Sequence, residues 1–148
     1  MAKRIEVISR GLIRCARGIL LCRNVQGGYS YLPGGRVEFG EPARETLRRE
    51  LLEEAALAIR PTTLALVAEG RFEEQRVHHE VNLVFHVEPE EWPNAVLSRE
   101  DDIEFHWAPW ESLEELDLRP ASIREFTASS KHMLDRVAEE GLQFLSME

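Results

Sequence analysis

Residues 35–57 read GRVEFGEPARETLRRELLEEAAL, and this stretch decides the fold expected for the chain. Pro42 fits the first turn of a helix, and Glu41 beside it places a negative charge at the positive end of the helix dipole. The sequence therefore predicts a helix that begins at Pro42 and ends at Ala55 or Ala56.

The predicted helix carries three carboxylates along the edge of an apolar face. At about 100° per residue, four small or apolar side chains share the buried face: Ala43, Leu47, Leu51 and Ala55. Glu54 points into this face, Glu50 lies on its margin, and Glu53 lies just beyond the margin. Removing such carboxylates from water is costly and their like charges repel, unless a cation lies between them.

A divalent cation would answer both penalties. Hard oxygen donors favour Mg²⁺, which is commonly shared between a few carboxylates and the phosphates of a substrate. The turn-forming segment 33–35 just upstream should break a strand, and its bare backbone could bring a carbonyl to the same cation. The alternative is an ordinary solvated helix face, in which Arg49 pairs with Glu45 and Glu53.

The stretch resembles the Nudix box, G-x5-E-x7-R-E-U-x-E-E-x-G-U, in which U is a bulky aliphatic residue. Eight specified positions are in register: Gly35, Glu41, Arg49, Glu50, Leu51, Glu53, Glu54 and Leu57. The departure is Ala56, where the family usually has glycine. Glycine tolerates the left-handed conformation that often ends a helix, whereas alanine there costs about 1 kcal/mol or more. We therefore expect a locally adjusted helix end, with activity retained.

The resemblance implies an α/β (α+β) Nudix fold, a mixed β-sheet between α-helices, with the box forming a loop, helix and loop beside the site. It also implies one to three Mg²⁺ ions, for which Mn²⁺ can substitute. The implied ligands are Glu50, Glu53, Glu54, the Gly34 carbonyl and, through a bound water or an outer contact, Glu41. Arg49 would orient these carboxylates by charge-assisted hydrogen bonds.

By the same resemblance, the cations would lower the pKa of a bound water and clamp the bridging phosphates, so that hydroxide attacks one phosphorus. The general base would be a box glutamate or a carboxylate from outside the box. Here Glu100 and Glu104 are the candidates, although both also fit an ordinary acidic loop.

The expected reaction is hydrolysis of the phosphoanhydride bond of a nucleoside diphosphate derivative such as ADP-ribose or a nucleotide sugar. Alternatives are a nucleoside triphosphate, including oxidised ones, a dinucleoside polyphosphate, a non-catalytic Nudix-fold regulator that binds nucleotides, or an unrelated acidic interaction domain. Candidate substrate-binding residues are Arg23, Arg36, Phe72 and Tyr31, with His78 and His79 near a base or sugar; packing or exposure explains each equally well. The two histidines are a poor metal pair, because consecutive strand residues face opposite sides.

Composition limits the remaining possibilities. The 148 residues, 43% of them hydrophobic, suit one domain spanning 1–148. A net charge of −9 repels nucleic acid, so a phosphate ligand has to be held locally by a cation. No apolar run reaches membrane-spanning length, and we expect a cytoplasmic protein. Cys15 and Cys22 are too few for a disulfide framework. A homodimer is expected because symmetric pairing is the commonest assembly.

Further elements follow from periodicity and turn residues. We expect two strands within 6–23, a short strand at 31–32, strands at 64–71, 77–88 and 103–107, a polar link at 72–76 and a surface loop at 88–102. Helices are expected over 112–116 and 120–138.

Overall fold

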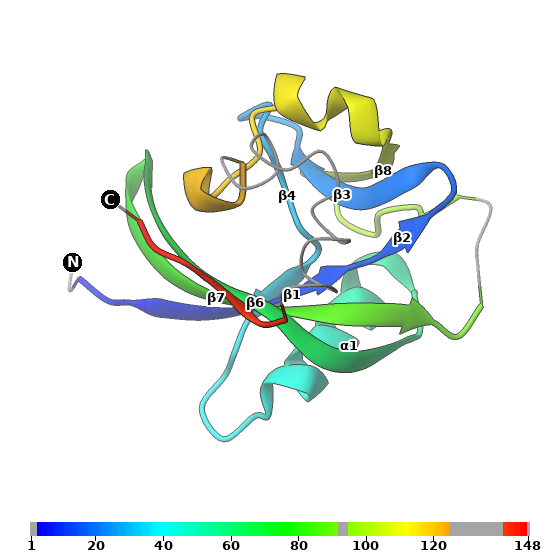
Figure 1. The fold of residues 1–148 in the computed structure, drawn as a ribbon, viewed down its shortest axis with the longest axis horizontal. Coiled ribbons are helices and arrows are strands. Elements are labelled where there is room, and N and C mark those ends of the chain that lie inside the picture. The colour runs from blue at the N-terminus through cyan, green and yellow to red at the C-terminus, as the bar shows by residue number, and fades with distance from the viewer. Residues whose placement is uncertain (1–2, 92–94, 125–140, 148) are drawn as a thin grey trace.

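The computed structural model describes residues 3–91, 95–124 and 141–147, and its strands form two sheets (Figure 1). The first sheet contains, in spatial order, β5 (Gly34–Arg36), β1 (Glu6–Leu12), β7 (Arg76–Pro89), β6 (Ile59–Glu74) and β9 (Gln143–Leu145). The second contains β2 (Arg14–Cys15), β3 (Gly18–Asn24), β4 (Ser30–Tyr31) and β8 (Ile103–Ala108). In this sheet β2, β4 and β8 each pair with β3.

The expected mixed sheet is confirmed. β1 runs parallel to β7 and antiparallel to β5, while β6 runs antiparallel to β7 and parallel to β9. The second sheet was not predicted from the sequence. It packs against the five-stranded sheet through Ile19 and Leu21 of β3, while Leu20 of β3 packs in the cluster under the helix α1 (Ala43–Ala55).

Two hydrophobic clusters hold these layers together. The cluster between the sheets contains Leu12, Ile19, Leu21, Leu32, Ala65, Leu66, Ala68, Val84, Ala108, Leu113, Leu118 and Ile123. The cluster under α1 contains Ile13, Leu20, Leu47, Leu51, Leu57, Ile59, Phe85, Val87 and Val96. Leu47 and Leu51 are fully buried, as the helical periodicity predicted, and they fix which face of α1 is turned outward.

The hairpin of β6 and β7 is longer than predicted. The expected polar link at 72–76 is wrong, because Phe72 pairs with His78 and Glu74 with Arg76 across Gln75 alone, whose φ is 56°. Exposed residues in this segment alternate with half-buried ones, as in a two-stranded ribbon with one face open to water. The extended hairpin contributes Phe72, Glu74 and His78 to one wall of a pocket described below.

The glycine-rich segment after β4 also differs from expectation. Gly34 and Gly35 lie in strand β5, paired with Arg10 and Ser9 of β1. Gly34 has a φ of +147°, and a Cβ at this position would lie 1.9 Å from the carbonyl oxygen of Ser9. The close approach of two backbones, rather than a turn, therefore requires glycine here.

The later helices agree with expectation only in part. The segment expected as a helix over 112–116 is a 3-10 helix, η1 (Trp110–Glu115). Of the helix expected over 120–138, residues 121–124 are helical with Ile123 fully buried, and residues 125–138 lie outside the described residues. No helix in the described part of the chain is both long and apolar enough to cross a membrane.

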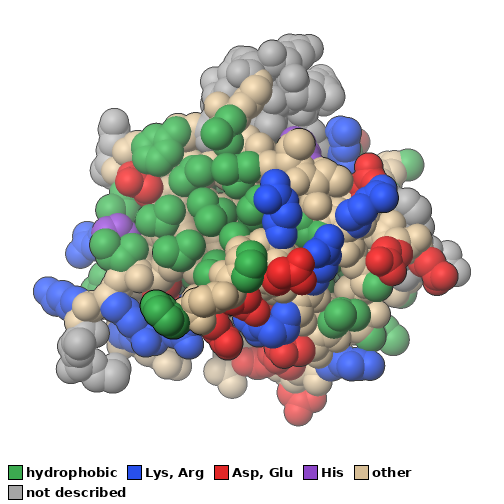
Figure 2. All heavy atoms as spheres, turned by 90° about the horizontal axis from the view of Figure 1, so that it is seen from below, with side chains coloured by type: hydrophobic (Ala, Val, Ile, Leu, Met, Phe, Trp, Pro, Cys, Tyr) green, Lys and Arg blue, Asp and Glu red, His purple; other side chains and the backbone are tan. Residues whose placement is uncertain are grey.

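The formal charge of −9 is not spread evenly over the surface. Figure 2 shows the molecule from the side of α1, where acidic and basic side chains crowd together over one part of the face and hydrophobic side chains gather over another. The acidic residues near α1 are thus interleaved with arginines, whose contacts define the candidate site.

Candidate active site

Helix α1 presents its carboxylates toward β5 and β1. The helix begins directly after Pro42, and the hydroxyl of Ser9 in β1 donates to the Ala43 carbonyl at 2.7 Å. This contact joins the first turn of the helix to the sheet. With Leu47 and Leu51 buried beneath, the helix cannot rotate, so the direction of each glutamate is set.

Arg49 is the centre of the carboxylate cluster. Its Nε and Nη2 donate to the two oxygens of Glu41 at 2.7 and 2.9 Å, and its Nη1 donates to Glu50 at 2.9 Å and to Glu53 at 3.4 Å. The hydrogen bonds from Arg49, with one from the Thr46 hydroxyl, lower the pKa of Glu41 to about 2. One guanidinium therefore contacts three acidic side chains, a geometry compatible with the orienting role of Arg49, which stays a prediction.

Glu54 points inward, as its position on the helical wheel predicted. Among the described residues, its Oε2 atom is buried and accepts no hydrogen bond. Burial raises the pKa of Glu54 well above its usual range, and the hydrogen bond and charge of Glu50 and the charge of Glu100 raise it further. A buried carboxylate oxygen with no donor is unusual, and it marks a position that a cation can satisfy.

Gly35 leaves the space in which Glu50 sits. A Cβ on Gly35 would lie 2.2 Å from the carboxyl carbon of Glu50. The glycine that the structure places against a box carboxylate is thus Gly35, whereas Gly34 faces the backbone of Ser9. The Gly34 carbonyl stays a prediction as a ligand.

The donor set fits a hard divalent cation. Glu50 and Glu54 lie side by side in a partly buried site, and all the available donors are oxygens. In the described part of the chain no three acidic, histidine or cysteine side chains already converge on one point, and Glu53, whose side chain is 59% exposed, is turned to Arg49. Glu53 would have to turn from Arg49 to share an ion with Glu50 and Glu54.

The structure distinguishes the two candidate bases outside the box. The Arg99 amide donates to the Glu54 carbonyl at 2.6 Å, which places the loop carrying Glu100 against the end of α1. Burial raises the pKa of Glu100, and the charges of Asp102, Glu50 and Glu53 raise this pKa further. Glu104 instead accepts a hydrogen bond from Arg23 at 3.3 Å, with both side chains largely exposed.

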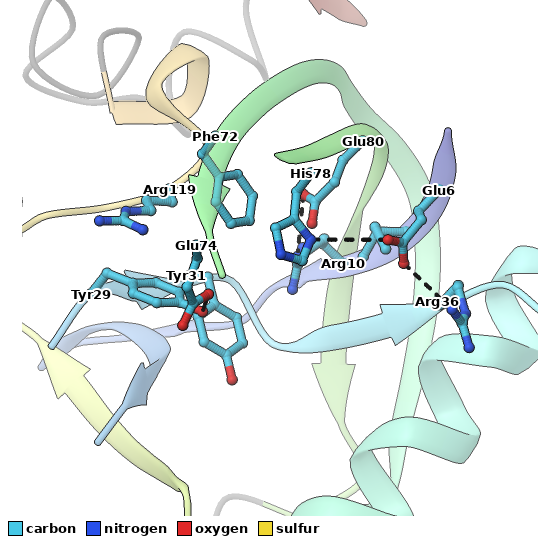
Figure 3. Close-up of a pocket in the computed structure, with 11 residues that line it drawn as sticks. Glu6, Arg10, Tyr29, Tyr31, Arg36, Phe72, Glu74, His78, Glu80 and Arg119 are labelled. Carbon is cyan, nitrogen blue, oxygen red and sulfur yellow. Dashed lines mark hydrogen bonds and ion pairs between the residues drawn. The ribbon is translucent and has the colours of Figure 1, made fainter. Parts of the chain in front are cut away.

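A pocket of about 260 Å³ lies beside the carboxylate cluster (Figure 3). Its lining includes three of the four residues predicted to bind substrate, Tyr31, Arg36 and Phe72. Arg23 is not among them. His78 also lines the pocket and stacks on Phe72, with ring centroids 4.7 Å apart, whereas His79 lines a different cavity on the other side of β7. The two histidines thus face opposite sides, as predicted.

Sequence reasoning missed several residues of this pocket. They are Glu6, Ile8, Arg10, Tyr29, Glu74, Glu80 and Arg119. Arg10 is the most informative, because it is buried, donates to Asn82 at 3.0 Å and to the Leu32 carbonyl at 2.9 Å, and faces Glu80 at 3.7 Å. A charged residue in the middle of the apolar β1 pattern was the available signal, since buried charges are rarely kept without partners.

Strand β5 lies between the pocket and Glu50 of the carboxylate cluster. Gly35 lies against Glu50, and the next residue, Arg36, lines the pocket. The Arg36 carbonyl accepts a hydrogen bond from Arg49 at 3.5 Å. Because consecutive strand residues face opposite sides, the pocket approaches the carboxylates of α1 instead at Tyr31 and Arg10, which interact electrostatically with Glu54.

Comparison with known proteins agrees with this geometry. A family model described as NUDIX domain matches residues 6–132. Among solved structures, a MutT protein from Methanosarcina mazei Go1 is similar with 25% identity and a TM-score of 0.69, over 95% of this chain and 97% of that one. A MutT NUDIX hydrolase from Burkholderia pseudomallei is similar with 24% identity and a TM-score of 0.61, over 74% and 86%. An ADP-ribose pyrophosphatase from Streptococcus suis 89-1591 shares the fold with 17% identity and a TM-score of 0.54, over 94% and 98%.

Proposed function

The chain belongs to the Nudix hydrolase family, and from this premise we propose that it hydrolyses the phosphoanhydride bond of a nucleoside diphosphate derivative such as ADP-ribose or a nucleotide sugar. Family membership makes it a pyrophosphohydrolase; the substrate is the proposal. The observation that carries it is that Tyr31 and Arg10, which line a pocket with aromatic walls, both interact electrostatically with Glu54 of α1.

The pocket suits a planar group attached to a diphosphate. Tyr29, Tyr31 and Phe72 supply aromatic surfaces, and Arg119 lies over the Tyr29 ring at 4.3 Å. Stacking on aromatic side chains is a general way of holding a nucleobase. With the base in this pocket, the diphosphate would extend past Tyr31 toward Glu54. The name of the ADP-ribose pyrophosphatase of the same fold is consistent with a substrate of this kind.

We propose Mg²⁺, for which Mn²⁺ can substitute, as the cation held by Glu50, Glu53 and Glu54, with the Gly34 carbonyl assisting. When bound, the cation supplies the charge that neutralises the bridging phosphates and acidifies water.

The chain's own residues have separate tasks in this proposal. Arg49 holds Glu41 and Glu50 in position through its fork of donors. Arg36 guides the diphosphate between the pocket and α1. A carboxylate oxygen of Glu100 accepts the proton of the attacking water. Glu100 is favoured over Glu104 for this task because Glu104 is paired with Arg23.

The test is product identification with purified protein. ADP-ribose, nucleotide sugars, nucleoside triphosphates with their oxidised forms, and dinucleoside polyphosphates are each incubated with Mg²⁺ and again with EDTA. We expect nucleoside monophosphate from the diphosphate derivatives, and none with EDTA. Pyrophosphate release from triphosphates at higher kcat/KM would support the alternative of a triphosphate pyrophosphohydrolase. Binding without turnover of any compound would support a non-catalytic regulator. The expected homodimer stays a prediction, which the molecular mass in solution tests.

A further inference from the structure

Glu6 occupies an unusual position at the mouth of the pocket. Its side chain is only 11% exposed and faces three basic groups: Arg76 Nη2 at 3.0 Å, Arg36 Nη1 at 3.6 Å and His78 Nδ1 at 4.0 Å. Figure 3 shows the carboxylate between Arg36 and His78. The Glu6 carboxylate thus contacts two arginines and a histidine beside the site, in a chain of net charge −9.

Without these basic side chains, the charge of Glu6 would be in an unfavourable position. In the parallel pairing of β1 and β7, Glu6 lies opposite Glu80, which also lines the pocket. Like charges opposite one another destabilise a sheet. Glu80 pairs with the buried Arg10, whereas Glu6 pairs with Arg36 and Arg76, whose side chains are 51% and 39% exposed.

Arg36 is the most available of the three arginines that line the pocket. The Arg10 side chain is 10% exposed and is bound to Asn82 and a backbone carbonyl. Arg119 is paired with Asp117 and lies over Tyr29. The Arg36 side chain is 51% exposed, and its contact with Glu6 is 3.6 Å long. A stronger anion would find Arg36 easier to recruit than Arg10 or Arg119.

We propose that Arg36 and Arg76 form a subsite for a phosphate group, and that the Glu6 carboxylate occupies this subsite when no ligand is bound. A phosphate carries more charge and more acceptor oxygens than a carboxylate, and it matches the guanidinium fork. The incoming phosphate displaces Glu6, whose place at the first residue of β1, next to the exposed residues 3–5, leaves its side chain room to turn outward. This inference rests on the proposed function only in taking the phosphate to be part of that substrate.

The test is calorimetric titration of the full chain with inorganic pyrophosphate in EDTA, so that no cation on α1 contributes. Relative to the unchanged protein, Glu6→Gln should lower the Kd of pyrophosphate by roughly tenfold, about the value of one charge-assisted hydrogen bond. Glu73→Gln is the matched control, because Glu73 is an exposed carboxylate on the same hairpin that does not line the pocket, and it should leave the Kd unchanged. The double variant Arg36→Gln/Arg76→Gln should lose the binding.

An unchanged Kd in Glu6→Gln, or binding that survives in the double arginine variant, would overturn the proposal. Acetate that binds as tightly as pyrophosphate would overturn the assignment to phosphate. Should Glu6→Gln fail to fold by circular dichroism, Glu6→Asp withdraws the carboxylate from Arg36 and should lower the Kd in the same direction. Because no hydrolysis is measured, failure here is separate from failure of the proposed reaction.

Discussion

Arg49 grips both carboxylate oxygens of Glu41, with Nε and Nη2 at 2.7 and 2.9 Å, while its remaining terminal nitrogen reaches Glu50 at 2.9 Å. Planar two-point contacts of this kind are specific to arginine, since a lysine ammonium is a single point charge. Arg49 thus joins Glu50 on its own helix to Glu41 just before the helix begins.

The first prediction concerns this fork. Arg49→Lys should lower kcat about 10- to 100-fold, the usual loss when the partner of a metal ligand is removed. Arg48→Lys is the matched control, because among the residues that the structure describes Arg48 pairs with Glu45 alone, on the exposed side of the helix, and it should leave kcat within about twofold. Equal losses in the two variants, measured under the same Mg²⁺ concentration, would contradict the orienting role.

The second prediction is that Glu54 is kept at the expense of stability. At about pH 8, Glu54→Gln should reduce turnover by orders of magnitude and raise the stability of the metal-free protein by roughly 1–3 kcal/mol, because the neutral amide removes a partly buried charge that Glu50 and Glu100 repel. Glu53→Gln should reduce turnover comparably without this gain, since Glu53 is exposed and bonded to Arg49. Urea unfolding in EDTA measures both free energies.

The pH dependence of this gain has a definite sign. The pKa of Glu54 is raised from 4.5 to about 8, so its contribution to folding is complete below pH 4.5 and is lost as the pH rises through 8. The stability of Glu54→Gln relative to the unchanged protein should therefore grow between about pH 4.5 and 8 and then level off. A difference that stays constant over this range would show that the carboxylate is not held protonated in the fold.

The third prediction tests the contact of Gly35 with Glu50. In Gly35→Ala the new methyl group should displace the Glu50 carboxylate, because the predicted distance to its carbon is 2.2 Å and the carboxylate is the more movable partner. We expect a folded protein with kcat reduced at least about tenfold. In a double-mutant cycle with Glu50→Ala, Gly35→Ala should cause little further loss. Full additivity would mean that Gly35 acts on something other than Glu50.

The fourth prediction concerns the end of α1. Ala56 takes the left-handed conformation, with φ 52° and ψ 30°, so the expected local adjustment of the helix end did not occur. Ala56→Gly should stabilise the protein by about 0.5–1 kcal/mol, the relief of left-handed strain less the greater freedom of glycine in the unfolded chain. Ala55→Gly, one residue earlier and helical, should destabilise by about 1 kcal/mol. Thermal unfolding should show opposite shifts in Tm.

The fifth prediction separates binding from chemistry. Phe72→Ala should raise KM about tenfold with kcat nearly unchanged, since an aromatic platform for a base is worth roughly 1–3 kcal/mol. Phe144→Ala is the control, because Phe144 is 64% exposed on β9 and does not line the pocket. A loss in kcat with KM unchanged would place Phe72 in the chemical step instead.

The sequence by itself determined the helix of the box and the direction of its side chains. Residues 43–55 form that helix, Leu47 and Leu51 are buried, and Glu54 points inward, all as predicted. These features depend on the repeat of 3.6 residues per helical turn within one segment, so the residues of that segment are enough to predict them. The family followed from the same segment, because the box has fixed spacing.

What faces that helix depends on the packing of distant segments. Arg10, Tyr29 and Arg119 meet Phe72 in one pocket, although they come from separate parts of the chain. The parallel pairing of β1 with β7 brings Glu6 beside Glu80, and the loop after β7 brings Glu100 rather than Glu104 to the carboxylates. Strand register and loop packing are set by contacts between distant segments, so the periodicity within one segment does not predict them.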